Sequence, residues 1–102
     1  MNEIQTTFCV VIRMREKTVM IRNKAGIHCR PSSAIMLAAA DFPGTSFLVT
    51  AAAGSTELKS ILDLLALGLQ KGDRVTVRAT GPNENEACEK IAGLFEKEFD
   101  FI

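Results

Sequence analysis

The spacing of the apolar residues constrains this chain most, because it changes along the sequence between the two-residue period of a strand and the longer period of a helix. Residues 74–80 carry the strand period in its clearest form, with Val75, Val77 and Ala79 alternating with polar side chains. In residues 29–41 the apolar residues recur at helical spacing instead. The sequence therefore predicts a domain that mixes strands and helices.

The order of these elements predicts the fold class. Strands are predicted for residues 17–24, 45–50, 55–58 and 74–80, and helices for residues 29–41, 60–68 and 83–99. Ser60 and Asp63 have the spacing of a capping box at the start of the second helix. The order β-α-β-β-α-β-α, with one apolar face on each element, favours an α+β fold. We expect a two-layer open-faced β-sandwich in which three helices cover one face of a four-stranded antiparallel sheet.

Length and charge limit the domain organisation and the partners. The 102 residues have room for one domain, residues 17–102, preceded by an N-terminal extension, residues 1–16, that is a tail or an extra edge strand. Twelve Lys and Arg balance twelve Asp and Glu, so no overall field attracts nucleic acid. The apolar run Phe8–Ile12 is shorter than a membrane span or a signal-peptide core. We expect a cytoplasmic monomer that binds neither nucleic acid nor a membrane.

The cysteines argue against a metal centre. Cys9, Cys29 and Cys88 are widely spaced, and the chain has one histidine to help them. Structural zinc sites need four such ligands, usually in closely spaced pairs. The sequence therefore predicts reduced thiols, no metal site and no cofactor.

His28 lies where the loop ending in Gly26 and Ile27 becomes the first predicted helix. The first N–H groups of a helix lack internal partners and carry the positive end of its dipole, so they can hold an anion such as phosphate. The same positive end disfavours imidazolium and keeps a ring nitrogen available as a nucleophile. Arg30 adds a charge that can pair with phosphate oxygens, and Pro31 stiffens the first turn. The alternative interpretation is that His28 is a helix cap or a solvated surface residue without a chemical function.

The segment around His28 resembles the phosphorylation site of a known family. The letters G-I-H-C-R-P, followed by L-K-S-I-L-D-L-L-A-L-G, K-G-D and A-T-G-P-N-E in the same order and spacing, are similar to the histidine-containing phosphocarrier proteins (HPr) of the bacterial phosphoenolpyruvate-dependent phosphotransferase system. The resemblance covers about residues 17–99. It implies the same open-faced β-sandwich that the periodicity predicts.

The resemblance also implies a function as a phosphocarrier, with the chemistry shared among partner proteins. His28 would accept a phosphoryl group on Nδ1 from enzyme I, which phosphoenolpyruvate charges, and pass it to enzyme IIA domains in sugar uptake. Arg30 would be the phosphate partner. Such a protein is a carrier with a phosphohistidine intermediate rather than an enzyme that works alone.

Ser60 is a candidate regulatory residue. Its position makes it the expected N-cap of the second helix, where an added phosphate would face free N–H groups. The resemblance implies that Ser60 matches a serine that a dedicated kinase/phosphorylase modifies, which stops carrier activity and recruits a transcription regulator. A substrate sequence does not reveal whether its kinase exists, so both interpretations stay open.

Ile61 and Leu65 are candidate docking residues. Periodicity alone favours a core position for both, whereas the corresponding helix of the family exposes apolar side chains to its partners. Two departures from the family pattern affect these sites. Cys29 follows the histidine where a small residue is usual, and Asp63 adds negative charge one turn from Ser60.

Other functions remain as alternatives. The chain would be a regulatory binding module of the same fold if its output ran through Ser60, although such modules usually lose the histidine that stands here at position 28. A nitrogen-related phosphorelay carrier would share the His28 signature, and the setting of Ser60 favours the sugar system. A redox protein based on Cys29 lacks a partner cysteine nearby.

Overall fold

A computed structural model of the chain describes residues 14–23, 26–27 and 29–97. The elements, in chain order, are β1 (Met14–Met20), α2 (Cys29–Ala40), β2 (Ser46–Ala51), β3 (Gly54–Thr56), α3 (Ile61–Ala66), β4 (Arg74–Thr80) and α4 (Glu84–Glu96). This is the predicted order. No helix in the described ranges is long and apolar enough to cross a membrane.

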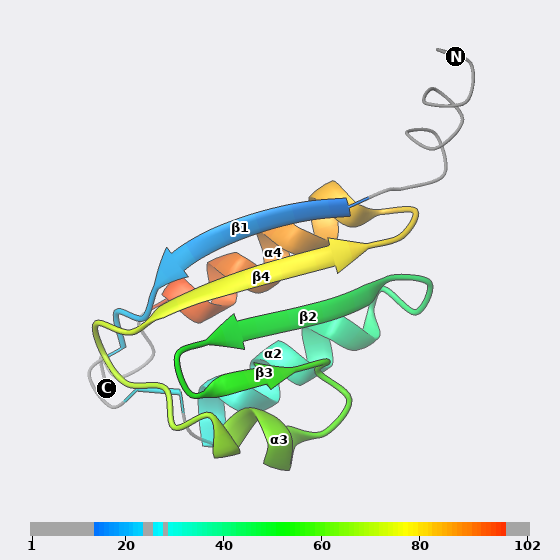
Figure 1. The fold of residues 1–102 in the computed structure, drawn as a ribbon. Helices are drawn as coiled ribbons and strands as arrows, with labels where there is room; N and C mark the ends of the chain where they lie inside the picture. Colours follow the sequence, from blue (N-terminus) through cyan, green and yellow to red (C-terminus); the bar gives the residue numbers. More distant parts are fainter. Residues whose placement is uncertain (1–13, 24–25, 28, 98–102) are drawn as a thin grey trace.

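The strands form one antiparallel sheet in the order β1-β4-β2-β3. Helices α2 and α4 lie against one face of this sheet, and α3 lies beside α2 near the β3 edge (Figure 1). No described helix covers the opposite face, where the hydroxyls of Thr18 and Thr76 are hydrogen-bonded at 2.8 Å. The predicted open-faced β-sandwich is confirmed.

The core lies between the sheet and the helices because each element turns its apolar side chains to that layer. The predicted alternation of β4 is confirmed: Val75, Val77 and Ala79 are fully buried, whereas their neighbours point away from the helices. Ile91 and Phe95 of α4 are fully buried against this face. Each large apolar side chain buried in this way stabilises the fold by about 1.5–3 kcal/mol.

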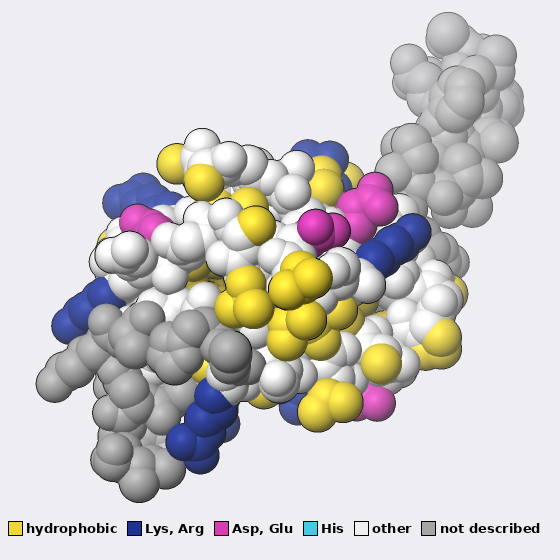
Figure 2. Space-filling model, turned by 90° about the horizontal axis from the view of Figure 1, so that it is seen from below, with side chains coloured by type: hydrophobic (Ala, Val, Ile, Leu, Met, Phe, Trp, Pro, Cys, Tyr) yellow, Lys and Arg dark blue, Asp and Glu magenta, His cyan; other side chains and the backbone are white. Residues whose placement is uncertain are grey.

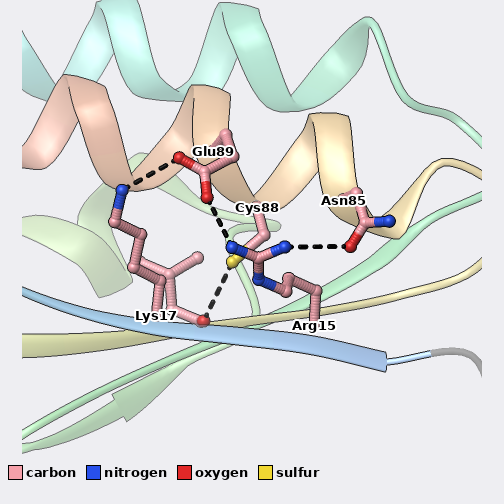
Figure 3. A network of polar contacts seen from close by, with 6 residues as sticks. Arg15, Lys17, Asn85, Cys88 and Glu89 are labelled. Atoms are coloured by element: carbon pink, nitrogen blue, oxygen red, sulfur yellow. Dashed lines mark hydrogen bonds and ion pairs between the residues drawn. The ribbon is translucent and has the colours of Figure 1, made fainter.

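The first strand differs most from its prediction. It runs over Met14–Met20 rather than residues 17–24, so the sheet begins inside the predicted extension. The inward positions at its start hold Arg15 and Lys17, and these charges hide the strand period from a search for alternating apolar residues. Both contact Glu89 of α4, Arg15 at 2.8 Å and Lys17 at 2.9 Å, and Arg15 also donates to the side chain of Asn85 (Figure 3).

Smaller boundary errors have local causes. The third strand is Gly54–Thr56 instead of residues 55–58, because Leu58 has a φ of 59°, which extended backbone does not adopt. The second and third helices are shorter than predicted. Phe99, predicted to lie in the third helix, falls outside the described residues. So do residues 1–13, and the division into an extension and a domain stays a prediction.

Candidate functional site

A short loop after β1 leads to the predicted site, and within it Asn23 and Gly26 are buried and bonded to each other. The side-chain amide of Asn23, fully buried, donates from Nδ2 to the carbonyl oxygen of Gly26 at 2.8 Å. The N–H of Gly26 donates back to the carbonyl oxygen of Asn23 at 2.9 Å. Gly26 has a φ of 76°, a conformation that costs other residues about 1–2 kcal/mol. Asn23 and Gly26 are thus joined by two hydrogen bonds of opposite direction.

The same loop is fastened on its other side to the turn that follows α3. The N–H of Ile27 donates to the carbonyl oxygen of Leu69 at 2.9 Å, and the Ile27 side chain is buried. A Cβ added to Gly26 would lie 2.3 Å from that same oxygen of Leu69. The close approach therefore requires glycine at position 26.

Helix α2 begins directly after this loop, as predicted, and presents a positive end. Its first turn contains no acidic side chain. Pro31 is fully buried in that turn, whereas Arg30 is exposed and makes no ion pair with any residue in the described part of the chain. The start of α2 thus offers a free guanidinium beside a helix N-terminus, which suits an anion. His28 lies outside the described residues.

Ser60 precedes α3, as predicted for an N-cap, but the predicted capping box is wrong. The Ser60 side chain makes no capping hydrogen bond, and only its carbonyl oxygen is used, by the N–H of Leu64 at 3.3 Å. Ser60 is half-buried, and Asp63 is exposed in the first turn. The spacing of the two residues indicated where the helix starts but not which way the hydroxyl points.

Helix α3 shows apolar side chains to solvent. Leu62 is 72% exposed, Ile61 and Leu65 are half-buried, and Leu64 is fully buried against the core. Hydrophobic side chains gather in the middle of the face that includes α3 (Figure 2). The sequence prediction named Ile61 and Leu65 and missed Leu62, because a helix of six residues is too short for its period to show which side faces water.

A hollow in the structure lies away from the predicted site residues. A cavity of about 450 Å³ lies between the end of α2, the start of β2 and the segment before α3, lined by Met36, Phe42, Phe47 and Leu58 among others. It contains none of the predicted site residues. No cluster of His, Cys, Asp and Glu able to hold a metal occurs among the residues that the structure describes.

Comparison with known proteins identifies the family of the chain. The family model described as the PTS HPr component phosphorylation site matches residues 15–97. The phosphocarrier protein HPr of Mycoplasma pneumoniae is 34% identical over 84 residues, which cover 82% of this chain and 96% of that protein. The chain belongs to the HPr family. It is therefore a phosphocarrier of the phosphotransferase system.

Other members of the HPr family match to a similar degree. The phosphocarrier protein NPr of Escherichia coli K12 is 35% identical over 85 residues, 83% of this chain and 94% of NPr. The structure of HPr-C-His from Thermoanaerobacter tengcongensis superposes with a TM-score of 0.72 at 31% identity, covering 79% of this chain and 90% of that one. The HPr structure from Bacillus anthracis has a TM-score of 0.75 at 24% identity, over 81% of this chain and 98% of that one, and supports the fold.

Proposed function

We propose that His28 accepts a phosphoryl group on Nδ1 from enzyme I, itself charged by phosphoenolpyruvate, and transfers it to enzyme IIA domains in sugar uptake in the cytoplasm. The observation that carries this proposal is the bonded loop of Asn23, Gly26 and Ile27, which leads within one residue of His28 to the N-terminus of α2. The chain belongs to a phosphocarrier family, and His28 is its one histidine.

The chemistry of this proposal divides between the carrier and its partners. The unprotonated imidazole nitrogen attacks phosphorus, a new N–P bond forms, and the bond from phosphorus to the donor breaks. The N–H groups at the start of α2 and the guanidinium of Arg30 then stabilise the negative charge of the bound phosphoryl group. Pro31, fully buried, keeps the first turn in place. The carrier needs no cofactor of its own.

Docking of both partners is assigned to the apolar side of α3. Leu62 extends into solvent and, with the half-buried Ile61 and Leu65, forms a small apolar patch. A patch of this kind suits transient binding, since a few aliphatic contacts give affinity without a large interface.

Regulation at Ser60 is the second part of the proposal. Ser60 is half-buried and its hydroxyl makes no capping bond, so a kinase/phosphorylase would not have to break one. A phosphate there would add two negative charges beside Asp63 and next to the α3 patch, which disfavours docking of the usual partners. The modified surface would then suit a transcription regulator instead.

A nitrogen-related phosphorelay is the alternative function. NPr and HPr relatives match this chain at 35% and 34% identity, and both names denote phosphocarriers. The two functions differ in the partner that charges and discharges His28, so they are separated by presenting the protein with both kinds of enzyme I. A regulatory binding module that does not use His28 is the remaining alternative.

The test is incubation with each purified enzyme I and labelled phosphoenolpyruvate, with His28→Ala as the control. We expect acid-labile, alkali-stable label on the natural protein and none on the variant. A label that survives in His28→Ala, or no label with either competent enzyme I, would contradict the assignment. Label from the nitrogen-related enzyme I alone would favour the phosphorelay.

A further inference from the structure

We propose that Asn23 is a positioning residue for phosphoryl transfer, acting through Gly26 and Ile27 on the place where His28 meets its partners. The inference rests on the proposed function of His28. Asn23 lies outside the segment from Gly26 to Pro31 that resembles the family's phosphorylation site, and its amide bonds to the backbone of that segment at Gly26.

The chain just before Asn23 is held by the sheet. Two residues earlier, the N–H of Ile21 donates to the carbonyl oxygen of Asp73 at 2.8 Å, and the carbonyl oxygen of Ile21 accepts from the N–H of Gly72 at 2.8 Å. These bonds continue the pairing of β1 with β4 beyond the end of the strands. The amide of Asn23 therefore extends from a backbone that is fixed to the sheet two residues earlier, at Ile21.

The side-chain amide of Asn23 connects this fixed part of the chain to Gly26 on the other side of the turn. Its Nδ2 donates to the carbonyl oxygen of Gly26, and the N–H of Gly26 returns the bond to the Asn23 backbone. Gly26 is buried, so without that donor its carbonyl oxygen would lose the partner that it has among the described residues, in a place away from water. The turn would then reorganise to find a new partner for the oxygen.

Reorganisation of this turn would reach His28 because little chain lies between them. Ile27 is buried and bonded to the carbonyl oxygen of Leu69, and α2 starts at Cys29 with Pro31 fully buried. One residue joins these two fixed points, and neighbouring Cα atoms are about 3.8 Å apart. A shift of Gly26 and Ile27 would therefore move the nucleophile relative to the donors of α2, and misplacement of about 1 Å is costly in transfer reactions.

Asparagine is suited to this task for a chemical reason. Its amide supplies a donor at the length needed to reach a backbone oxygen three residues on, as asparagine does in many turns. Leucine has the same branched shape but is larger and has no donor, so Asn23→Leu removes the bond and keeps the site filled. Asn23→Ala removes the bond and leaves the site unfilled.

The test measures phosphorylation of Asn23→Ala and Asn23→Leu by enzyme I, with kcat and KM determined separately. The loss of the buried hydrogen bond from Asn23 to Gly26 predicts a fall in kcat of about tenfold. KM should stay within about twofold, because the α3 patch that docks enzyme I is untouched. The amide hydrogen of Ile27 should also exchange about tenfold faster, which reports on the turn without reference to activity.

Cys88→Ala is the matched control. Cys88 is buried in α4, its Sγ contacts the carbonyl oxygen of Val77 at 3.4 Å, and it lies on an element that does not bond to the turn. Cys88→Ala should lose stability while kcat, KM and Ile27 exchange stay as in the natural protein.

The outcomes separate the positioning role of Asn23 from the proposed function of His28. Natural kcat in both Asn23 variants would overturn the positioning role, as would an equal fall in kcat for Cys88→Ala at equal stability. A rise in KM with kcat unchanged would also overturn it. Failure of enzyme I to phosphorylate the natural protein would instead overturn the proposed function on which the inference rests.

Discussion

The loop that ends at Ile27 and helix α3 meet at the turn containing Leu69, yet they are held in different ways. In the loop, Asn23 and Ile27 are buried and bonded, and only glycine fits at position 26. In α3, six residues long, Leu64 is the buried anchor, while Leu62 extends into water and Ser60 leaves its hydroxyl unused for capping.

The difference follows from what each region is proposed to do. A reacting group gains from a fixed position, which hydrogen bonds between buried backbone groups supply. A surface that meets several partners gains instead from exposed side chains whose rotamers can adapt to each. The two regions meet at Leu69 but are held by different contacts, so a change in one should be separable from a change in the other.

The largest effect is expected from Gly26→Ala. The new Cβ would collide with the carbonyl oxygen of Leu69 and force a positive φ on alanine, which together should destabilise the protein by about 3 kcal/mol. Gly68→Ala is the control, because Gly68 has a similar φ of 60° but an open space around its Cβ position. Urea unfolding should show a cost of about 1 kcal/mol for Gly68→Ala. Equal costs would mean that the contact with Leu69 does not constrain the loop.

Leu62→Ala should act on docking and not on the loop. Removal of an exposed side chain that a partner buries predicts a KM for enzyme I raised about tenfold, with kcat nearly unchanged. Met20→Ala is the matched control, since Met20 is 44% exposed on β1, away from α3. If both variants behave as the natural protein does, the apolar patch of α3 is not the docking surface.

A pH titration tests whether the charge-dependent part of stability lies outside both regions, in the ion pair between β1 and α4. The hydrogen bond from Lys17 and its charge lower the pKa of Glu89 below the ordinary 4.5, and the same bond raises the pKa of Lys17 above 10.5. Ionised Glu89 therefore adds stability above pH 4.5, and this is lost as the pH falls through its lowered pKa. The contribution of Lys17 is present below pH 10.5 and is lost as the pH rises through its raised pKa.

Melting temperatures should therefore show a difference between the natural protein and Glu89→Gln that shrinks below pH 4.5. Glu86→Gln, at an exposed position of α4 without an ion pair to a described residue, should follow the natural protein throughout. A constant difference for Glu89→Gln across the acid range would place the pH dependence elsewhere.

The smallest effect is expected from Ser60→Ala. Loss of an N-cap side chain usually costs about 1 kcal/mol, but the Ser60 hydroxyl makes no capping bond, so the free energy of unfolding should change by less than about 0.5 kcal/mol. Chemical denaturation checks this. A loss near 1 kcal/mol would show that the hydroxyl caps α3 in solution and would remove part of the contrast with the loop.

Sequence reasoning succeeded where one face of an element is uniformly apolar. The boundaries of β4 were predicted correctly because Val75, Val77 and Ala79 alternate with polar residues over its whole length. It failed at β1, where Arg15 and Lys17 take inward positions and are satisfied by a carboxylate from the far end of the chain. A pairing of residues more than 70 positions apart leaves no trace in local periodicity.

The residues of the candidate site also divide into those that the sequence placed correctly and one that it missed. Arg30 and Pro31 were placed at the start of α2 by the order of residues alone, and the structure has them there. Asn23 was missed because residues 17–24 were predicted to be a strand, in which a polar residue is expected on the solvated side until its burial is known. The sequence signal was an asparagine shortly before a glycine, which is typical of a turn closed by its own side chain.

The charged start of β1 also bears on how the protein behaves when crowded. Among the described strands β1 lies at an edge of the sheet, and the backbone groups on its outer side could serve as a template for a strand from another copy. On its helix side, however, such a strand would have to lie against Arg15, Lys17 and their partner Glu89, and would strip water from all three (Figure 3). The cluster that obscured the strand in the sequence thus protects its edge from aggregation.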